Sequence, residues 1–147
     1  FLLAAILWPK LIERCSFENG INVRKFFRSM DSIIAEQQRI TAIPRKFSSY
    51  IKDIWYLQLK LNDRLKNNPN KIIKHPRFRA GYDFLLIREK ASKDQSDLGK
   101  WWTSFQHADA KSKEKMIGKV RKTIESDGNF NPRKGEGKEF GFSEELR

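Results

Sequence analysis

Apolar residues recur at steps of three and four positions along most of this chain, and that spacing constrains its fold more than any other feature. Such steps place side chains on one face of an α-helix, whereas a half-buried strand needs alternation at every second position. The longest stripe comprises Val23, Phe26, Phe27, Met30, Ile33, Ile34 and Gln37. No alternating stretch of useful length occurs, so the sequence predicts an all-α fold.

Prolines, asparagines and glycines divide this pattern into an irregular bundle of about five to six helices. Asn19-Gly20 ends the first helix, and Asn22 can cap the second. Pro44 separates the second helix from the third, because the residue before a proline avoids the α region. The sequence "NNPN" at 67–70 predicts a turn, and Pro76 suits the first turn of the next helix.

The helices after Pro44 have well-defined apolar positions. The third helix offers Phe47, Tyr50, Ile51, Ile54, Trp55, Leu61 and Leu65, and the fourth offers Phe78, Tyr82, Leu85 and Leu86. Leu98, Trp101, Trp102 and Phe105 form a further helical set. These last aromatic side chains could stack on nucleic-acid bases, but their spacing favours the core for Trp102 and Phe105.

The chain divides into a helical body, residues 1–107, and a C-terminal part, residues 108–147. The body carries 20 basic and 10 acidic side chains, and the C-terminal part carries 10 and 8. Residues 111–125 predict a weak basic helix that would bury Met116, Ile117, Val120 and Ile124. The Gly-rich stretch beyond it has no periodic apolar pattern, so we expect a mobile tail.

The N-terminal apolar run, 1–8, is too short to span a bilayer, and Pro9 predicts a kink or a late helix start. The missing initial Met favours a piece of a longer polypeptide. Cys15 is the single cysteine, so no internal disulfide can form. Together with His75 and His107 it offers no zinc spacing, and we expect a reduced, cytoplasmic setting.

A concentrated positive charge is the strongest functional signal. The chain has a net charge of +12, and residues 39–79 contain eleven basic side chains against two acidic ones. A merely solvated helix face usually mixes both signs, whereas one-sign clustering favours a groove for a phosphate backbone. An anionic membrane surface and a bland solubilising face remain alternatives.

Two helix starts carry paired cations. Arg45 and Lys46 follow Pro44, and Arg77 and Arg79 follow Pro76. Cations oppose the helix dipole at these positions unless an anion binds there. Arg79 can also pair with Asp83 one turn later. The candidate nucleic-acid contacts are Arg39, Arg45, Lys46, Lys52, Lys74, Arg77 and Arg79.

Catalytic signatures are absent from the sequence. It contains no Gly-x-Gly-x-x-Gly, P-loop or nucleophile elbow, and its carboxylates are scattered. Phosphoryl chemistry on nucleotides needs closely spaced carboxylates that hold metal ions. We therefore assign no catalytic or metal-ligating residue, and the chain taken alone is typical of a binding module.

Five motifs follow one another along the chain: "FLLAAILWP" (1–9), "IPRKF" (43–47), "IWYLQ" (54–58), "HPRFRAGYDF" (75–84) and "WWTSFQ" (101–106). Together, and in this order, they resemble the C-terminal half of bacterial poly(A) polymerase. This family belongs to the class II nucleotidyltransferases and is related to the CCA-adding enzymes. The resemblance covers residues 1–107, and the last two motifs help to separate poly(A) polymerases from CCA-adding enzymes.

The resemblance implies an all-helical body and arm that holds RNA. A separate N-terminal head would bind ATP and Mg²⁺ and add AMP units to single-stranded RNA 3′ ends, marking transcripts for decay. Arg45, Lys46, Arg77 and Arg79 become candidate RNA contacts on this ground as well. The family often ends in an arginine-rich tail, whereas residues 108–147 here are nearly balanced in charge.

Two other functions remain open at this point. The chain could be the matching region of a CCA-adding enzyme, with tRNA as its partner. It could instead be a structural helical module that contacts proteins or an anionic membrane surface.

Overall fold

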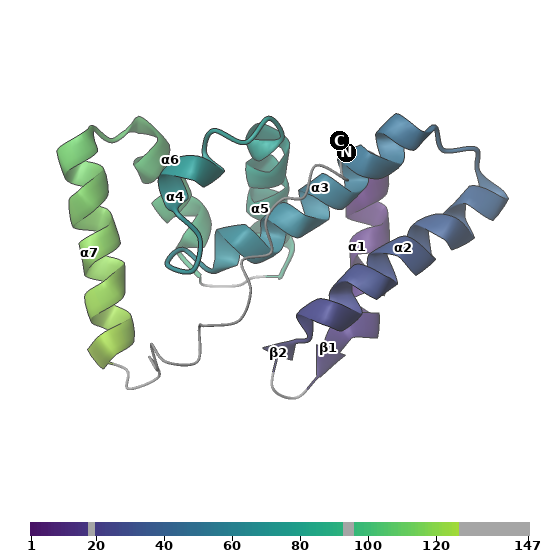
Figure 1. The fold of residues 1–147 in the computed structure, drawn as a ribbon, viewed down its shortest axis with the longest axis horizontal. Helices are drawn as coiled ribbons and strands as arrows, with labels where there is room; N and C mark the ends of the chain where they lie inside the picture. Colours follow the sequence, from purple (N-terminus) through teal and green to yellow (C-terminus); the bar gives the residue numbers. More distant parts are fainter. Residues whose placement is uncertain (18–19, 93–95, 127–147) are drawn as a thin grey trace.

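The computed structural model describes residues 1–17, 20–92 and 96–126, and it confirms the all-α prediction. The elements are α1 (Leu2–Cys15), β1 (Ser16–Phe17), β2 (Gly20–Ile21), α2 (Val23–Ile40), α3 (Arg45–Asn62), α4 (Pro69–Ile72), α5 (Phe78–Ser92), α6 (Leu98–His107) and α7 (Ala110–Ser126). These described parts thus contain seven helices, more than the five to six expected (Figure 1). The mobile tail that we expected beyond α7 lies outside them.

The first two helices lie side by side (Figure 1). In α1, buried side chains recur at steps of three and four, and the helix continues through Pro9 from Leu2, so the late start was wrong. A small antiparallel strand pair, Ser16↔Ile21 and Phe17↔Gly20, then turns the chain. The Asn22 side chain accepts a hydrogen bond from the Lys25 N–H at 2.9 Å, which confirms the predicted cap of α2.

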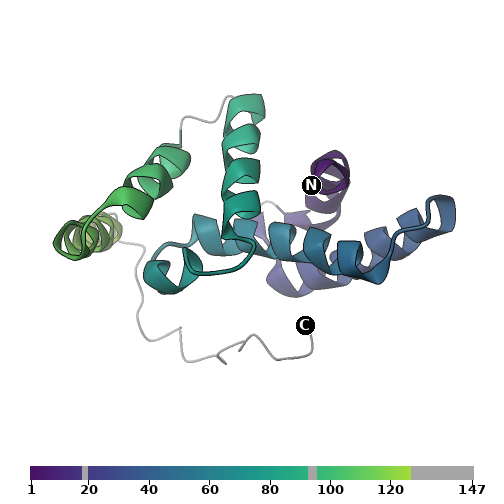
Figure 2. The same cartoon turned by 90° about the horizontal axis from the view of Figure 1, so that it is seen from above.

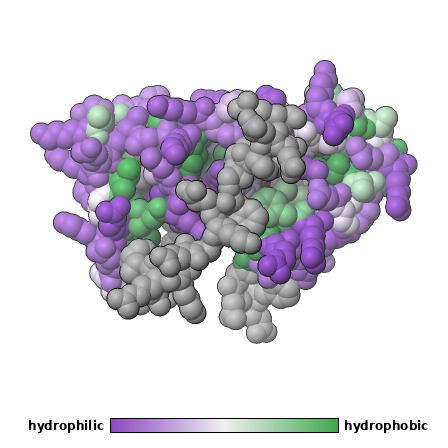
Figure 3. Space-filling view, in the orientation of Figure 1, coloured by the Kyte–Doolittle hydropathy of each residue, from purple (hydrophilic) through white to green (hydrophobic). Residues whose placement is uncertain are grey.

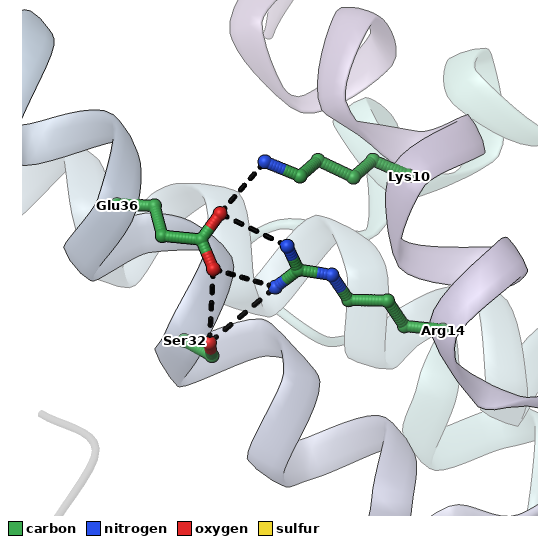
Figure 4. A network of polar contacts seen from close by, with 4 residues as sticks. All are labelled: Lys10, Arg14, Ser32 and Glu36. Carbon is green, nitrogen blue, oxygen red and sulfur yellow. Dashed lines mark hydrogen bonds and ion pairs between the residues drawn. The ribbon is translucent and has the colours of Figure 1, made fainter.

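A polar network also joins α1 to α2 (Figure 4). The Glu36 carboxylate accepts hydrogen bonds from Lys10 Nζ at 2.7 Å and from both terminal nitrogens of Arg14 at 2.8 and 2.9 Å. These bonds, chiefly those from Arg14, lower the pKa of Glu36 to about 2. The bidentate geometry fixes how the two helices face each other.

Two hydrophobic cores share α3. The first combines α1, α2, the first half of α3 and Phe84 of α5. The second combines the end of α3 with α4, α5 and α6. Each core contains a fully buried tryptophan whose indole N–H reaches a backbone carbonyl: Trp55 donates to Ala4 at 2.9 Å, and Trp102 donates to Leu61 at 3.0 Å. The burial expected for Trp55, Trp102 and Phe105 is confirmed.

The helices α3 and α5 cross at a glycine. A Cβ atom on Gly81 would lie only 2.9 Å from Leu57 Cδ1 and 3.0 Å from Leu57 Cβ. Gln58, fully buried beside it, donates hydrogen bonds from Nε2 to the Ile54 and Gly81 carbonyls, each at 3.0 Å. This close approach holds the start of α5 against the middle of α3.

The segment between α3 and α5 differs from its prediction. Asn68 caps a short helix, α4, by accepting from the Asn70 N–H at 2.9 Å, where only a turn was expected. Pro76 lies in a turn, in which the Phe78 N–H donates a hydrogen bond to the His75 carbonyl at 2.9 Å. The helix α5 begins only at Phe78. The placement of Pro76 in the helix was therefore wrong by two residues.

Some predicted core positions also differ. Phe47 is 51% exposed, because it lies in the first turn of α3 at the end of the bundle. Leu65 follows the end of α3 and is half-buried, as is Leu86. In α7 only Val120 is buried, and Met116, Ile117 and Ile124 are half-buried.

The helices α1 and α5 do not cover the whole circumference of α3. These two helices lie on the same side of α3 (Figure 2), and the rings of Trp8 and Phe84 link them at 5.4 Å. The side chains on the remaining face of α3 form the candidate site.

In the described parts of the chain, none of the helices is both long and apolar enough to cross a bilayer.

Candidate nucleic-acid interface

The side of α3 away from α1 and α5 carries a basic stripe, and part of it packs against α2, where the Phe27 ring lies 5.3 Å from the Tyr56 ring. Arg45, Ser49, Lys52, Tyr56 and Lys60 follow one another at steps of four, three, four and four, which keeps them on one side of the helix. Arg45 is exposed and the other four are half-buried. From Arg45 to Lys60 the stripe spans about 22 Å at 1.5 Å per residue.

The N-terminus of α3 adds to this positive character. Pro44 precedes the helix and provides no side-chain cap, and the first turn contains Arg45 and Lys46 but no acidic residue. The ammonium group of Lys46 lies 5.0 Å from the centre of the exposed Phe47 ring. The helix start therefore combines unpaired N–H groups with two cations, an arrangement suited to a phosphate.

The turn before α5 brings Arg77 onto α3. Its guanidinium lies over the Tyr50 ring at 4.7 Å, and its Nε atom is 4.0 Å from Asp53 Oδ2. The Arg77 N–H donates to His75 Nδ1 at 3.0 Å, and its carbonyl accepts from the Gly81 N–H. Arg77 thus shares the surface of α3 with Lys46, which lies one turn before Tyr50.

Arg79 is placed differently. Arg79 lies in the first turn of α5, whereas Arg77 lies in the turn before that helix. Its Nε atom donates to Asp83 Oδ2 at 3.1 Å, the intrahelical pair that the sequence offered as an alternative. Its guanidinium also lies 5.8 Å from the Tyr82 ring, and 78% of its side chain is exposed. The structure brings Arg77 to α3 but does not bring Arg79 there.

Of the remaining sequence-predicted contacts, Lys52 lies in the stripe, and Arg39 and Lys74 lie on other segments. Lys52 Nζ lies 2.6 Å from Asp31 Oδ1 on α2, so one acidic group already pairs with it. Arg39 is exposed in the last turn of α2, and Lys74 is exposed in the turn between α4 and α5. These two residues lie on segments that follow or precede the stripe, not on α3 itself.

Partial burial shifts the pKa values of three groups on or near α3. Burial raises the pKa of Asp53, although His75 and Arg77 oppose the shift. Burial likewise lowers the pKa of Lys60 and that of His75, the latter against the attraction of Asp53. Charges that are partly removed from water interact more strongly with an incoming ion than fully solvated charges do.

Sequence reasoning did not select Tyr50, Tyr56, Lys60 or Arg64 as site residues. The signal for Lys60 was present, because it continues the helical spacing of Arg45 and Lys52. The role of Tyr50 depends on a contact with Arg77, 27 residues away in the sequence. No local pattern reveals that contact.

A cleft lies where the stripe ends. It has a volume of about 250 Å³ and is lined by Arg64 after α3, by Trp101 of α6, and by α7 through Met116, Lys119, Val120, Thr123 and Ile124. Figure 3 shows hydrophobic surface at this junction of α7 with the end of α3, among mainly hydrophilic side chains. Both cations lining the cleft extend the positive charge of α3.

The single cysteine and the potential metal-ligating side chains give less indication of a functional site. Cys15 is fully buried, its Sγ atom donates to the Leu11 carbonyl at 2.9 Å, and burial raises its pKa, which makes a reactive thiolate unfavourable. In the parts of the chain described above, no three His, Cys, Asp or Glu side chains gather into a metal site.

Comparison with known proteins identifies relatives of the chain. It is 33% identical over 122 residues to poly(A) polymerase I of Haemophilus influenzae, covering 80% of this chain and 27% of the relative. It is 35% identical over 112 residues to poly(A) polymerase I of Escherichia coli O6:H1, covering 72% and 24%. For Salmonella typhi poly(A) polymerase I the identity is 30% over 126 residues, covering 82% and 27%.

The chain therefore spans about a quarter of the length of these curated relatives. The family described as "Polymerase A arginine-rich C-terminus" matches residues 20–138, which include every helix from α2 to α7. Because that match covers most of the chain and agrees with the three relatives, this protein belongs to the bacterial poly(A) polymerase family, of which it represents the C-terminal region.

Proposed function

We propose that this segment holds single-stranded RNA for a bacterial poly(A) polymerase that adds AMP from ATP to RNA 3′ ends. Arg77 carries the proposal, because it reaches α3 from a separate turn and lies against Tyr50 and Asp53, beside the basic stripe. One phosphate backbone could then contact cations from two parts of the chain. Contacts to phosphate are independent of sequence, as a polymerase that accepts many transcripts requires.

The rest of the reaction would be carried by another part of the polypeptide. We propose that a nucleotidyltransferase head binds ATP and Mg²⁺ and receives the RNA 3′ end from this segment. The whole enzyme would act in the cytoplasm on transcripts. The family match and the basic stripe on α3 support this proposed separation of RNA holding from catalysis.

Salt-dependent binding of RNA by the 147-residue chain tests the binding role. A fluorescently labelled oligo(A) and a mixed-sequence unstructured RNA should bind with similar affinity. The logarithm of each association constant should fall linearly with the logarithm of salt concentration, by about 0.7 per phosphate contact. Negligible RNA binding at physiological salt would leave a structural helical module as the better assignment.

Extension of RNA by the full-length polypeptide tests the substrate. Growth of long A-tracts on both unstructured RNA and tRNA is the expected result. Strict addition of CCA to tRNA would instead identify a CCA-adding enzyme and reject the proposed substrate.

A further inference from the structure

The cleft at the end of α3 continues the basic stripe and differs from it in chemistry. Arg64 follows Lys60 by four residues, just beyond the last residue of α3. Its guanidinium lies 5.1 Å from the centre of the Trp101 ring on α6. On α7, Met116 and Val120 give the cleft apolar walls, whereas the face of α3 is mainly polar.

Arg64 is a partly desolvated cation that has no acidic partner among the residues that the structure describes. Burial lowers its pKa, and among the described residues no carboxylate forms an ion pair with it. The second cation of the cleft, Lys119, adds to the positive potential. A half-buried cation loses part of its hydration, and a nearby anion compensates that loss, so the cleft favours a ligand with negative charge.

The stacking of side chains in the cleft provides a flat surface. The Phe105 ring stacks on Trp101 at 4.8 Å with an interplanar angle of 11°, and it thereby covers one face of the indole. Arg64 also lies over the Trp101 ring. The outer side of a guanidinium plane is a surface on which an unpaired RNA base can stack.

We propose that this cleft binds one unpaired nucleobase of the RNA, with an adjoining phosphate beside Lys119. The base would lie against the Arg64 guanidinium and the apolar side chains of α7. This inference rests on the proposed RNA-binding function and adds a base-contacting subsite to it. Two features select a nucleotide as occupant: the continuity of the cleft with the basic stripe, and the union of apolar walls with two cations.

Abasic scanning tests the subsite in the 147-residue chain. A series of oligo(A) molecules carries one abasic nucleotide at successive positions, and the affinity of each is measured at one salt concentration. Because stacking of one base contributes substantially to binding, one position should lose about fivefold or more in affinity. Abasic nucleotides at the other positions should have smaller effects, because phosphates dominate the contacts there.

Two variants assign that position to the cleft. Thr123→Trp fills the cleft and should abolish the position-specific loss, whereas Ser112→Trp, at an exposed site near the start of α7, should preserve it. Arg64→Lys keeps the charge but lacks the planar stacking group. The Arg64→Lys variant should also abolish the position-specific loss of affinity, and it should leave the salt dependence of binding unchanged.

The outcomes separate this inference from the function on which it rests. Salt-dependent RNA binding without any position-specific loss overturns the subsite and leaves the proposed function intact. A loss that persists in both Thr123→Trp and Arg64→Lys also overturns it. Failure of the chain to bind any of these RNAs rejects the proposed function and the subsite together.

Discussion

Arg77 and Arg79 are two residues apart, yet their side chains contact different helices. Arg77 packs on Tyr50 and approaches Asp53, both on α3. Arg79 pairs with Asp83 on its own helix. The position of a cation in the sequence therefore does not decide whether it belongs to the proposed interface; the turn that precedes α5 decides it.

Single substitutions should separate the two arginines. Arg77→Gln should weaken RNA binding clearly, because it removes an oriented cation from the face of α3. Arg79→Gln should weaken it less, since this side chain already has a carboxylate partner on its own helix. Fluorescence anisotropy with unstructured RNA at fixed salt measures both, and a larger effect of Arg79→Gln would move the RNA path to the other side of α5.

Glu36 is the residue whose charge most clearly supports the fold. Its pKa is about 2 in the folded chain, below its ordinary value of 4.5, because Arg14 and Lys10 bind the carboxylate. A carboxylate with a lowered folded-state pKa stabilises the protein above its unfolded-state pKa and loses that effect as pH falls toward the folded value. The network in Figure 4 should therefore stabilise the α1–α2 pair at neutral pH.

Thermal unfolding of Glu36→Gln as a function of pH checks this assignment. The variant should have a lower Tm than the wild type at pH 6–7, and the difference should narrow as pH falls from about 4.5 toward 2. A Tm difference that stays constant over this range would show that the carboxylate charge is not the cause.

Among the elements, the crossing of α3 and α5 depends on one small residue. Gly81→Ala would place a Cβ within 3.0 Å of Leu57, including its Cβ atom, which cannot move without the backbone. We expect this variant to lose about 1–3 kcal/mol of unfolding free energy, the usual cost of overpacking.

Gly118 on α7 is the matched control. A Cβ at this position meets nothing within 4 Å, so Gly118→Ala should stabilise the chain by about 0.5–1 kcal/mol through helix propensity. Chemical denaturation measures both variants. Equal effects of the two alanines would contradict the close approach of α3 and α5.

The sequence predicted the long helices well because their signals are local. Asn22 and Pro44 mark true boundaries, and the apolar stripe of α2 is buried at Phe26, Met30, Ile33 and Ile34. The short elements were missed. The strand pair Ser16–Phe17 and Gly20–Ile21 has too few residues to show alternation, and α4 depends on the Asn68 cap within a stretch rich in turn residues.

The proposed interface was only partly predictable for the same reason. Arg45 and Lys46 lie at a helix start that Pro44 already marks, so their exposure follows from local sequence. The convergence of Arg77 with α3, and of Arg64 with Trp101, depends on tertiary contacts. Those contacts follow from the packing of both cores, which no short pattern encodes.

At the scale of the whole molecule, α3 has two roles. Its apolar side joins both cores, through Trp55 in one and Leu61 in the other. Its remaining side presents the basic stripe, and Arg77 lies beside that stripe, against Tyr50 and Asp53. Because the same helix organises the interior and carries the cations, the proposed RNA path is held by an element that is anchored in both cores.

The salt dependence of RNA binding in two matched double variants tests this account most directly. Arg45→Gln with Lys60→Gln removes two cations from the stripe on α3. Lys90→Gln with Lys100→Gln removes two exposed cations from the far end of α5 and from α6. We predict that the first pair reduces the salt slope by about 1.4 and that the second leaves it unchanged. Equal slopes for the two double variants would contradict the assignment of the RNA path to α3.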